Sequence, residues 1–293
     1  MNKAFLYVIA TAFLFGTMEV ALKVGGSSFG ALQLTFLRFL IGGLFLLPFA
    51  LHDLKKRSYR FSAGDWGYLL LLGLVCICIS MVLFQVGVMR TNANMAAIII
   101  SINPVFTMLF ARLILKELFT KRKALVLALS ITGLIIVANP LSLLSGNSLN
   151  GILITFAAAV TFGLYTALGK LRIARIGGIT QNSFSFLLGS AILLIILLIK
   201  GEPVISGVVP DQLALVLYLG VFVTGIGYYC YLKAIELAGP STASIAFFIK
   251  PVFAPVLAFL VLQEPITLHM IVGVCFVLAG SVANLWGVKK AEE

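Results

Sequence analysis

Two stretches of the chain, SINPVFTMLFARLILKE (residues 101–117) and FIKPVFAPVLAFLVLQE (residues 248–264), are near copies of each other and decide the fold. Both carry Pro-Val-Phe, then matching alanine and leucine positions, and a closing glutamate. They differ at one informative position, where Asn103 in the first copy is replaced by Lys250 in the second. An ammonium group inside an apolar run is costly to bury, so Lys250 needs either a partner or a task.

The composition is that of a membrane protein. Hydrophobic residues make up 61% of the 293 residues, charged residues only 11%, and the mean hydropathy is +1.13. A water-soluble globule of this size could not bury so much apolar surface. The net charge of +11 lies in short clusters between apolar runs, with no basic face that would bind nucleic acid. We therefore expect an all-α polytopic membrane protein in contact with the lipid bilayer.

The lengths of the apolar runs predict ten membrane spans. About 20 residues of helix cross the hydrocarbon core. The first run resembles a signal peptide, but the repeat described below favours a retained first helix. The expected spans are residues 4–22, 30–50, 66–87, 93–114, 122–139, 149–169, 181–199, 212–233, 240–262 and 267–287.

The positive charges predict the orientation of these spans. With the N-terminus in the cytoplasm, sixteen lysines and arginines fall on the cytoplasmic side and three, namely Lys23, Arg90 and Lys200, on the outside. This is the asymmetry that the positive-inside rule expects. We predict a plasma or inner membrane protein with both termini in the cytoplasm.

The chain repeats itself at an offset of 147 residues. Phe15-Gly16 aligns with Phe162-Gly163, Lys23 with Lys170, and Pro104-Val105-Phe106 with Pro251-Val252-Phe253. This predicts two units, residues 1–146 and 147–293, of five spans each. Because five is odd, the second unit enters the membrane upside down, an arrangement typical of secondary transporters.

These motifs resemble the drug/metabolite transporter superfamily, specifically its ten-helix EamA type. The likeness rests on Phe-Gly with a downstream lysine, on Leu37-Arg38-Phe39, and on the Pro-Val-Phe stretches. It covers essentially the whole chain. It implies a basket of ten helices around a central cavity, lined mostly by helices 1, 3, 4, 6, 8 and 9.

Three charged residues within the expected spans, Glu19, Arg38 and Lys250, each have two interpretations. Lys250 either binds an anionic group of the cargo or is tied to carbonyls that Pro251 and Pro255 leave without a donor. Glu19 either pairs with Lys23 or Arg38 or contacts the cargo as a coupling carboxylate. For Arg38 the structural role is favoured.

Further candidates follow from polarity and position. Asn103, Gln85, Tyr165 and Tyr229 are added to Lys250 and Glu19 as candidate substrate-binding residues. A structural or gating role is expected for Arg38, Pro104, Pro251, Glu117 and Glu264. The two glutamates precede the fifth and tenth spans, where a carboxylate or a threonine can cap the next helix.

The favoured function is secondary transport of a small organic metabolite, an amino acid or a carboxylate, by alternating access. The sequence has no Gly-rich nucleotide-binding loop, and no cofactor is expected. Proton coupling, sodium coupling and simple exchange are all compatible with it. The alternatives are a membrane enzyme or a scramblase acting on a lipid-like substrate, but the scattered acidic residues and the two distant histidines form no metal-binding motif.

Overall fold

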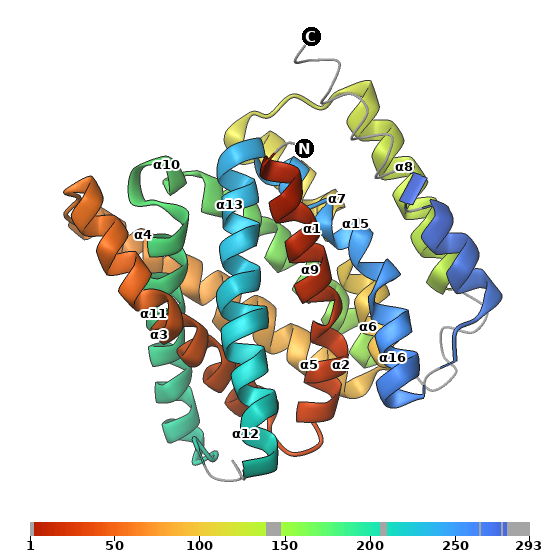
Figure 1. The fold of residues 1–293 in the computed structure, drawn as a ribbon, viewed down its shortest axis with the longest axis horizontal. Helices are drawn as coiled ribbons and strands as arrows, with labels where there is room; N and C mark the ends of the chain where they lie inside the picture. Colours follow the sequence, from red (N-terminus) through yellow and green to blue (C-terminus); the bar gives the residue numbers. More distant parts are fainter. Residues whose placement is uncertain (1–2, 139–147, 206–209, 264, 277, 280–293) are drawn as a thin grey trace.

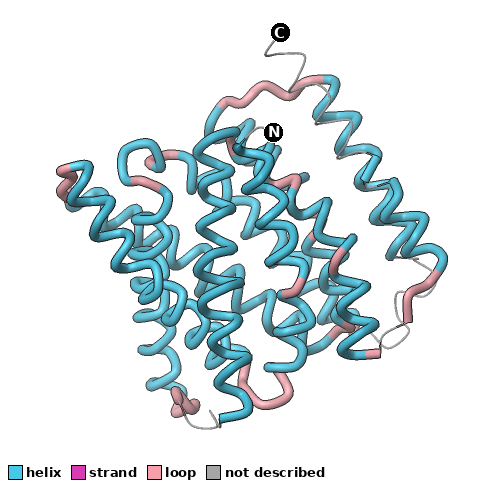
Figure 2. Tube along the Cα trace, viewed as in Figure 1, coloured by secondary structure: helices cyan, strands magenta, loops and turns pink. Residues whose placement is uncertain are grey.

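The computed structural model describes residues 3–138, 148–205, 210–263, 265–276 and 278–279. Within these residues every regular element is a helix, and the connections are short (Figure 2). Eight passes are long and apolar enough to cross a membrane: Lys3–Gly25, Ala31–Arg57, Ala63–Arg90, Ala93–Leu115, Leu149–Lys170, Gly178–Lys200, Gln212–Ala238 and Pro240–Leu262. The multi-pass helical fold predicted from composition is confirmed.

Several passes consist of more than one helical segment. The first half contains α1 (Lys3–Gly16), α2 (Met18–Gly25), α3 (Ala31–Arg57), α4 (Ala63–Gly73), the π-helix η1 (Leu74–Met81), α5 (Val82–Arg90), α6 (Ala93–Ile100), α7 (Asn103–Leu115) and α8 (Lys121–Ala138). The second half contains α9 (Leu149–Lys170), α10 (Ile173–Ile176), α11 (Gly178–Lys200), α12 (Pro210–Leu217), the π-helix η3 (Tyr218–Gly227), α13 (Tyr228–Ala238), α14 (Pro240–Ala243), α15 (Ala246–Ile249), the 3-10 turn η4 (Lys250–Val252) and α16 (Ala254–Leu262).

The fifth and tenth expected spans correspond to shorter helical segments among the described residues. The span expected at 122–139 is α8, whose apolar part runs over Lys123–Gly133. The span expected at 267–287 is helical over 268–276, and most of its remainder lies outside the described residues.

Helix ends extend beyond the hydropathy boundaries. The span expected at 30–50 continues to Arg57, and the one expected at 66–87 begins at Ala63. A capping box between Ser62 and Asp65 starts α4, and basic residues occupy the last turn of α3, where the helix dipole favours them. Hydropathy identifies only the apolar part of such helices.

The two halves run in opposite directions. In Figure 1, α1 descends from the end of the bundle where the N-terminus lies, whereas its repeat equivalent α9 ascends. The same reversal relates α3 to α11 and α7 to α16. The inverted repeat inferred from the sequence is therefore present in the fold.

The repeated motifs contact each other across the two halves. A Cβ placed on Gly16 would lie 2.8 Å from Cβ of Phe253, and one placed on Gly163 would lie 2.7 Å from Cβ of Phe106. Each Phe-Gly motif thus receives the phenylalanine of the Pro-Val-Phe motif from the other half. Only glycine leaves room for this approach, which explains why both motifs recur together.

Repeat-equivalent residues also meet near the centre of the bundle. Phe39 and Phe186 pack edge to face with ring centroids 4.9 Å apart, and the Tyr228 hydroxyl lies 3.1 Å from Sδ of its equivalent Met81. Such contacts between equivalent residues mark the pseudo-two-fold axis. Around it lies a buried aromatic cluster, which we define as Phe15, Phe39, Phe162, Tyr165, Phe186, Tyr228, Tyr231 and Phe247.

Candidate functional site

The chain breaks its helical path at two places that bring charged residues together. The first pass is interrupted at Thr17, and α2 restarts at Met18 with Glu19 in its first turn. The pass Pro240–Leu262 is interrupted by the 3-10 turn that begins at Lys250. Pro251 has no N–H to donate and cannot continue the α-helical hydrogen bonds, which accounts for the second break.

Glu19 and Lys250 form an ion pair between the two halves. The Lys250 ammonium donates to Oε1 of Glu19, and both side chains are fully buried. The rings of Phe84 and Phe247 lie 5.7 and 5.6 Å from Nζ. An isolated charge would be far more costly here than a paired one. The structure thus gives Lys250 a carboxylate partner rather than the proline-freed carbonyls.

The expected pairing of Glu19 with Lys23 is wrong. Lys23 donates to the carbonyls of Val88 and Thr91 instead, at the C-terminal end of α5. Its repeat equivalent Lys170 does the same for α13, donating to the carbonyls of Ile235 and Glu236 at 2.9 and 3.0 Å. Cations stabilise helix C-termini, so the repeated lysine is a capping residue.

Arg38 lies near this pair but is not bonded to it. Its charge is close enough to interact with those of Glu19 and Lys250. Nη1 points at Sδ of Met18, 3.5 Å away, and the guanidinium lies 4.6 Å from the centroid of the Phe39 ring. Nε and Nη2 are buried and donate to no atom of the described structure. The expected pairing of Glu19 with Arg38 is therefore also wrong.

Gln85 belongs to the same region. Its amide Nε2 donates to the carbonyl of Leu22 on α2 at 3.3 Å, three residues beyond Glu19. Its Oε1, like Oε2 of Glu19, is buried without a donor in the described structure. Of the candidates from sequence, Lys250, Glu19 and Gln85 are thus brought together.

Asn103 has a different environment from its equivalent Lys250. It donates to the carbonyl of Ala159 at 3.1 Å and accepts from Thr107 at 3.0 Å, and so joins α7 to α9. The neighbouring Pro104 stands in the first turn of α7, directly after the break at 101–102. In this half, the broken helix is held by neutral hydrogen bonds.

The two candidate tyrosines are separated. Tyr165 belongs to the aromatic cluster and donates to Oδ1 of Asn182 at 3.4 Å. Tyr229 lies instead against Tyr7 and lines a surface pocket of about 340 Å³ with His52 and Asp53. Asn182 was not singled out from the sequence, although a buried asparagine within an apolar span was the signal that could have identified it.

Glu117 holds the start of the pass Pro240–Leu262 in place. It accepts from the Ser241 hydroxyl and pairs with Lys123 at 3.0 Å. Thr120 performs the expected capping, because its hydroxyl accepts from the N–H of Lys123 at 3.2 Å. Glu264 lies outside the described residues.

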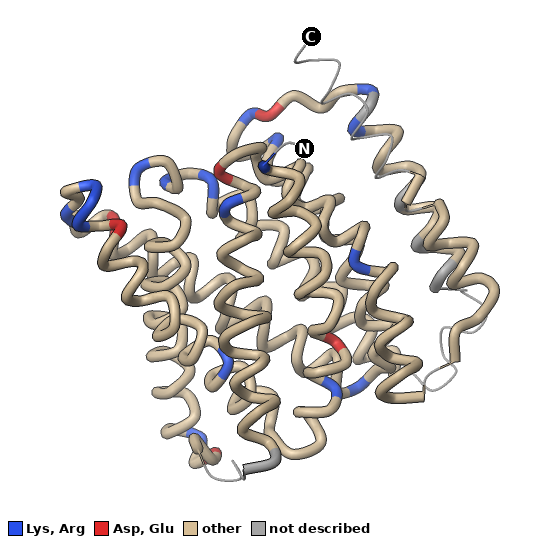
Figure 3. Tube along the Cα trace, viewed as in Figure 1, with Lys and Arg blue, Asp and Glu red and all other residues tan. Residues whose placement is uncertain are grey.

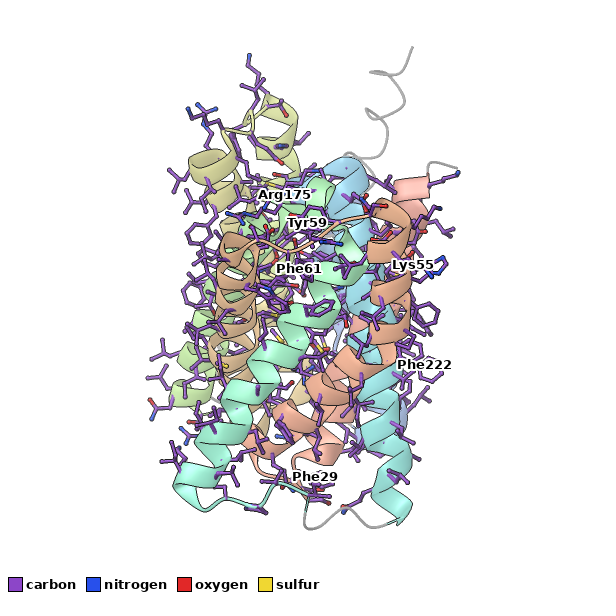
Figure 4. All side chains as sticks on the ribbon, turned by 90° about the vertical axis from the view of Figure 1, so that its left-hand side faces the viewer. Phe29, Lys55, Tyr59, Phe61, Arg175 and Phe222 are labelled. Atoms are coloured by element: carbon purple, nitrogen blue, oxygen red, sulfur yellow. The ribbon has the colours of Figure 1, made fainter. Side chains whose placement is uncertain are left out.

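A second charged network joins the halves at the end of the bundle where the basic residues gather (Figure 3). Asp65 is fully buried and accepts from Arg172 at 2.8 Å and from Arg175. It also accepts from the Tyr59 hydroxyl at 2.7 Å. Figure 4 shows Tyr59 and Arg175 at this same end. Partial burial and the bond to Asp65 raise the pKa of Tyr59, which keeps its hydroxyl a donor at neutral pH. We call Asp65, Arg172 and Arg175 the latch.

A membrane-spanning bundle of two inverted repeats, with broken helices and a buried ion pair between the repeats, is an architecture typical of transporters. The comparison with known families is specific: the EamA-like transporter family matches residues 2–139 and again residues 149–286. The chain therefore belongs to the EamA-like transporter family and is a multi-pass transporter.

Individual relatives agree with this assignment. An uncharacterized transporter of Clostridium kluyveri is 37% identical over 300 residues, which covers 100% of this chain and 96% of that protein. The uncharacterized transporter YyaM of Bacillus subtilis is 26% identical, covering 78% of this chain and 74% of its own. A crystal structure with 16% sequence identity matches the fold with a TM-score of 0.78 over 100% of both chains.

Proposed function

We propose that this transporter moves a small organic metabolite, an amino acid or a carboxylate, by alternating access. The observation that carries the proposal is the buried Glu19–Lys250 pair, because its two members come from opposite halves. Each member lies at or next to a helix break, as in carriers whose halves rock around a central site. Relative motion of the halves would make and break this pair.

The pair also accounts for binding and release. A cargo carboxylate or ammonium can replace one partner of the pair, so neither charge has to be buried alone. On this proposal the chain needs no cofactor, and the driving force is a proton or sodium gradient or exchange of one metabolite for another. The aromatic cluster would exclude water from the site.

The orientation is part of the proposal. The charge asymmetry supports an orientation with both termini on the cytoplasmic side of a plasma or inner membrane. A reporter fused at the N-terminus should be protected from an external protease in intact cells, whereas a tag inserted after Gly201 should be cleaved. Cleavage of the N-terminal reporter and protection of the tag after Gly201 would show the opposite orientation.

The function is tested by flux in proteoliposomes. Radiolabelled amino acids and carboxylates are offered with and without a pH gradient, and saturable uptake of at least one is expected. Lys250→Ala and Lys250→Gln should abolish that uptake while the protein still inserts and folds. Normal transport by both variants would remove Lys250 from the site, and no flux of any cargo would refute the proposed function.

A further inference from the structure

The buried charges of the transporter do not balance. Among the described residues, the buried charged side chains are those of Glu19, Arg38, Asp65 and Lys250. Asp65 is matched by the arginines of the latch. Glu19 and Lys250 neutralise each other whether the shared proton sits on the amine or on the carboxylate. Arg38 is therefore the one buried charge in the described part of the chain without a counter-charge.

Arg38 cannot remove this imbalance by losing its proton, because a guanidinium stays charged in proteins. Its Nε and Nη2 atoms have no acceptor, and its neighbours Met18 and Phe39 supply only a thioether and a ring face. An unsatisfied buried guanidinium is expensive to maintain. Nε and Nη2 together form the fork that binds the two oxygens of a carboxylate.

Two acceptors complement this donor. Oε2 of Glu19 and Oε1 of Gln85 are buried without a donor, and both residues contact or belong to α2. A ligand that pairs with the guanidinium and satisfies one of these acceptors must carry a carboxylate and a hydrogen-bond donor. The net charge of the ligand distinguishes a hydroxy acid from an amino acid. A monoanion brings the net charge of Glu19, Lys250, Arg38 and the ligand to zero, whereas a zwitterion leaves the charge of Arg38 uncompensated.

We propose that the cargo site is centred on Arg38 and takes a hydroxylated monocarboxylate, with the carboxylate on the guanidinium and the hydroxyl donating to Oε2 of Glu19 or to Oε1 of Gln85. This rests on the proposed transport function and narrows its cargo to net anions. Arg38 is fully enclosed in the described conformation, so the site is reached only when the halves move apart.

The test measures thermal unfolding of the full-length protein in lipid nanodiscs. The probes are three matched compounds that share one carbon skeleton. The first is an alpha-hydroxy acid, the second is the corresponding alpha-amino acid, and the third is the amide in which a carboxamide replaces the carboxylate. The alpha-hydroxy acids should stabilise the wild type with an apparent affinity roughly tenfold above that of the amino acids and amides. Equal or stronger stabilisation by the amino acids would overturn the proposal.

Substitution of Arg38 separates a cargo site from a structural residue. Arg38→Met should abolish stabilisation by the hydroxy acids but raise the unfolding temperature without ligand, because an uncompensated charge is removed. Arg38→Lys should keep weakened binding, and exposed Arg60→Met is the control that changes neither quantity. A lower ligand-free unfolding temperature in Arg38→Met, or unchanged hydroxy-acid binding, would overturn the proposal.

Failure of the inference is distinguishable from failure of the proposed function. Saturable amino-acid flux that Arg38→Met leaves intact would refute the anion site and preserve the transporter mechanism. Binding of hydroxy acids that depends on Arg38, without flux of any solute, would support the site and refute transport.

Discussion

Lys250 and Glu19 form a unit whose members cannot be judged separately. Replacing either one leaves the other buried without its partner, which costs roughly 3–5 kcal/mol in comparable buried pairs. We expect Lys250→Met and Glu19→Gln each to lower the stability of the protein by several kcal/mol, and the double variant to recover most of that loss. Unfolding in detergent, read as a double-mutant cycle, measures the coupling.

A matched control for this cycle is the Lys233–Glu236 pair, whose N–O distance is 2.9 Å and whose side chains are 31% and 23% exposed. Its loss in Lys233→Met should cost less than about 1 kcal/mol. Additive effects of the Glu19 and Lys250 substitutions would show that the two side chains are not coupled.

The sequence identified both residues of the central pair but not the pairing. Glu19 and Lys250 are separated by 231 positions, and helical spacing instead favoured Lys23, one turn away. Lys23 does not pair with Glu19 because its ammonium caps the C-terminal end of α5 in the tertiary structure. Arg38 could be recognised as intramembrane, but its lack of a counter-charge depends on three-dimensional neighbours that no local pattern records.

At the scale of elements, the repeated lysines are expected to hold the ends of α5 and α13. Lys170→Met removes a cation that donates to two carbonyls, so we expect a loss of about 1–3 kcal/mol. Hydrogen exchange should accelerate selectively over the last turn of α13. Lys121→Met is the control, because Lys121 is exposed and stands at the start of α8 rather than at a helix C-terminus, and an equal loss there would contradict the capping role.

The helix crossings depend on glycine at the Phe-Gly motifs. A methyl group at Gly163 would lie 2.9 Å from the backbone nitrogen of Thr107 as well as against Phe106, and the backbone cannot move aside easily. We expect Gly163→Ala to destabilise the protein by roughly 1–3 kcal/mol. Gly67, inside α4, has no atom within 4 Å of an added Cβ, so Gly67→Ala should instead be neutral or stabilising by up to about 1 kcal/mol. The unfolding midpoints of the two variants should therefore shift in opposite directions, and a shared direction would contradict the close crossing.

The recurrence of Phe-Gly and Pro-Val-Phe was sufficient to predict the elements and their inversion. It could not predict that each motif packs on the other motif from the opposite half. Breaks at Thr17 and at 101–102 were also missed within spans expected to be continuous, because hydropathy averaged over a whole span does not register an interruption of one or two residues.

At the scale of the whole molecule, the inverted repeat puts equivalent positions at the two opposite ends of the helix bundle. The charges at these equivalent positions differ. The latch occupies the end where the N-terminus lies, whereas its repeat-equivalent positions at the other end are Gln212, Gly25 and Ser28, none of them charged. Ion pairs that join the halves stabilise closure at the end where they form. Under the proposed alternating access, this asymmetry would bias the transporter toward conformations closed at the latch.

Neutralising Asp65 should remove this bias. Asp65→Asn leaves Arg172 and Arg175 without their carboxylate, so the latch end opens more often, and amides of residues 172–182 and 59–66 should exchange several-fold faster. Because the central pair lies away from the latch, the hydrogen exchange of α2 should change little. Glu202→Gln, which affects the exposed Lys200–Glu202 pair, is the control and should leave both regions unchanged. Unaltered exchange in Asp65→Asn would mean that packing alone keeps this end closed, and the direction of opening would then have to be set by the cargo.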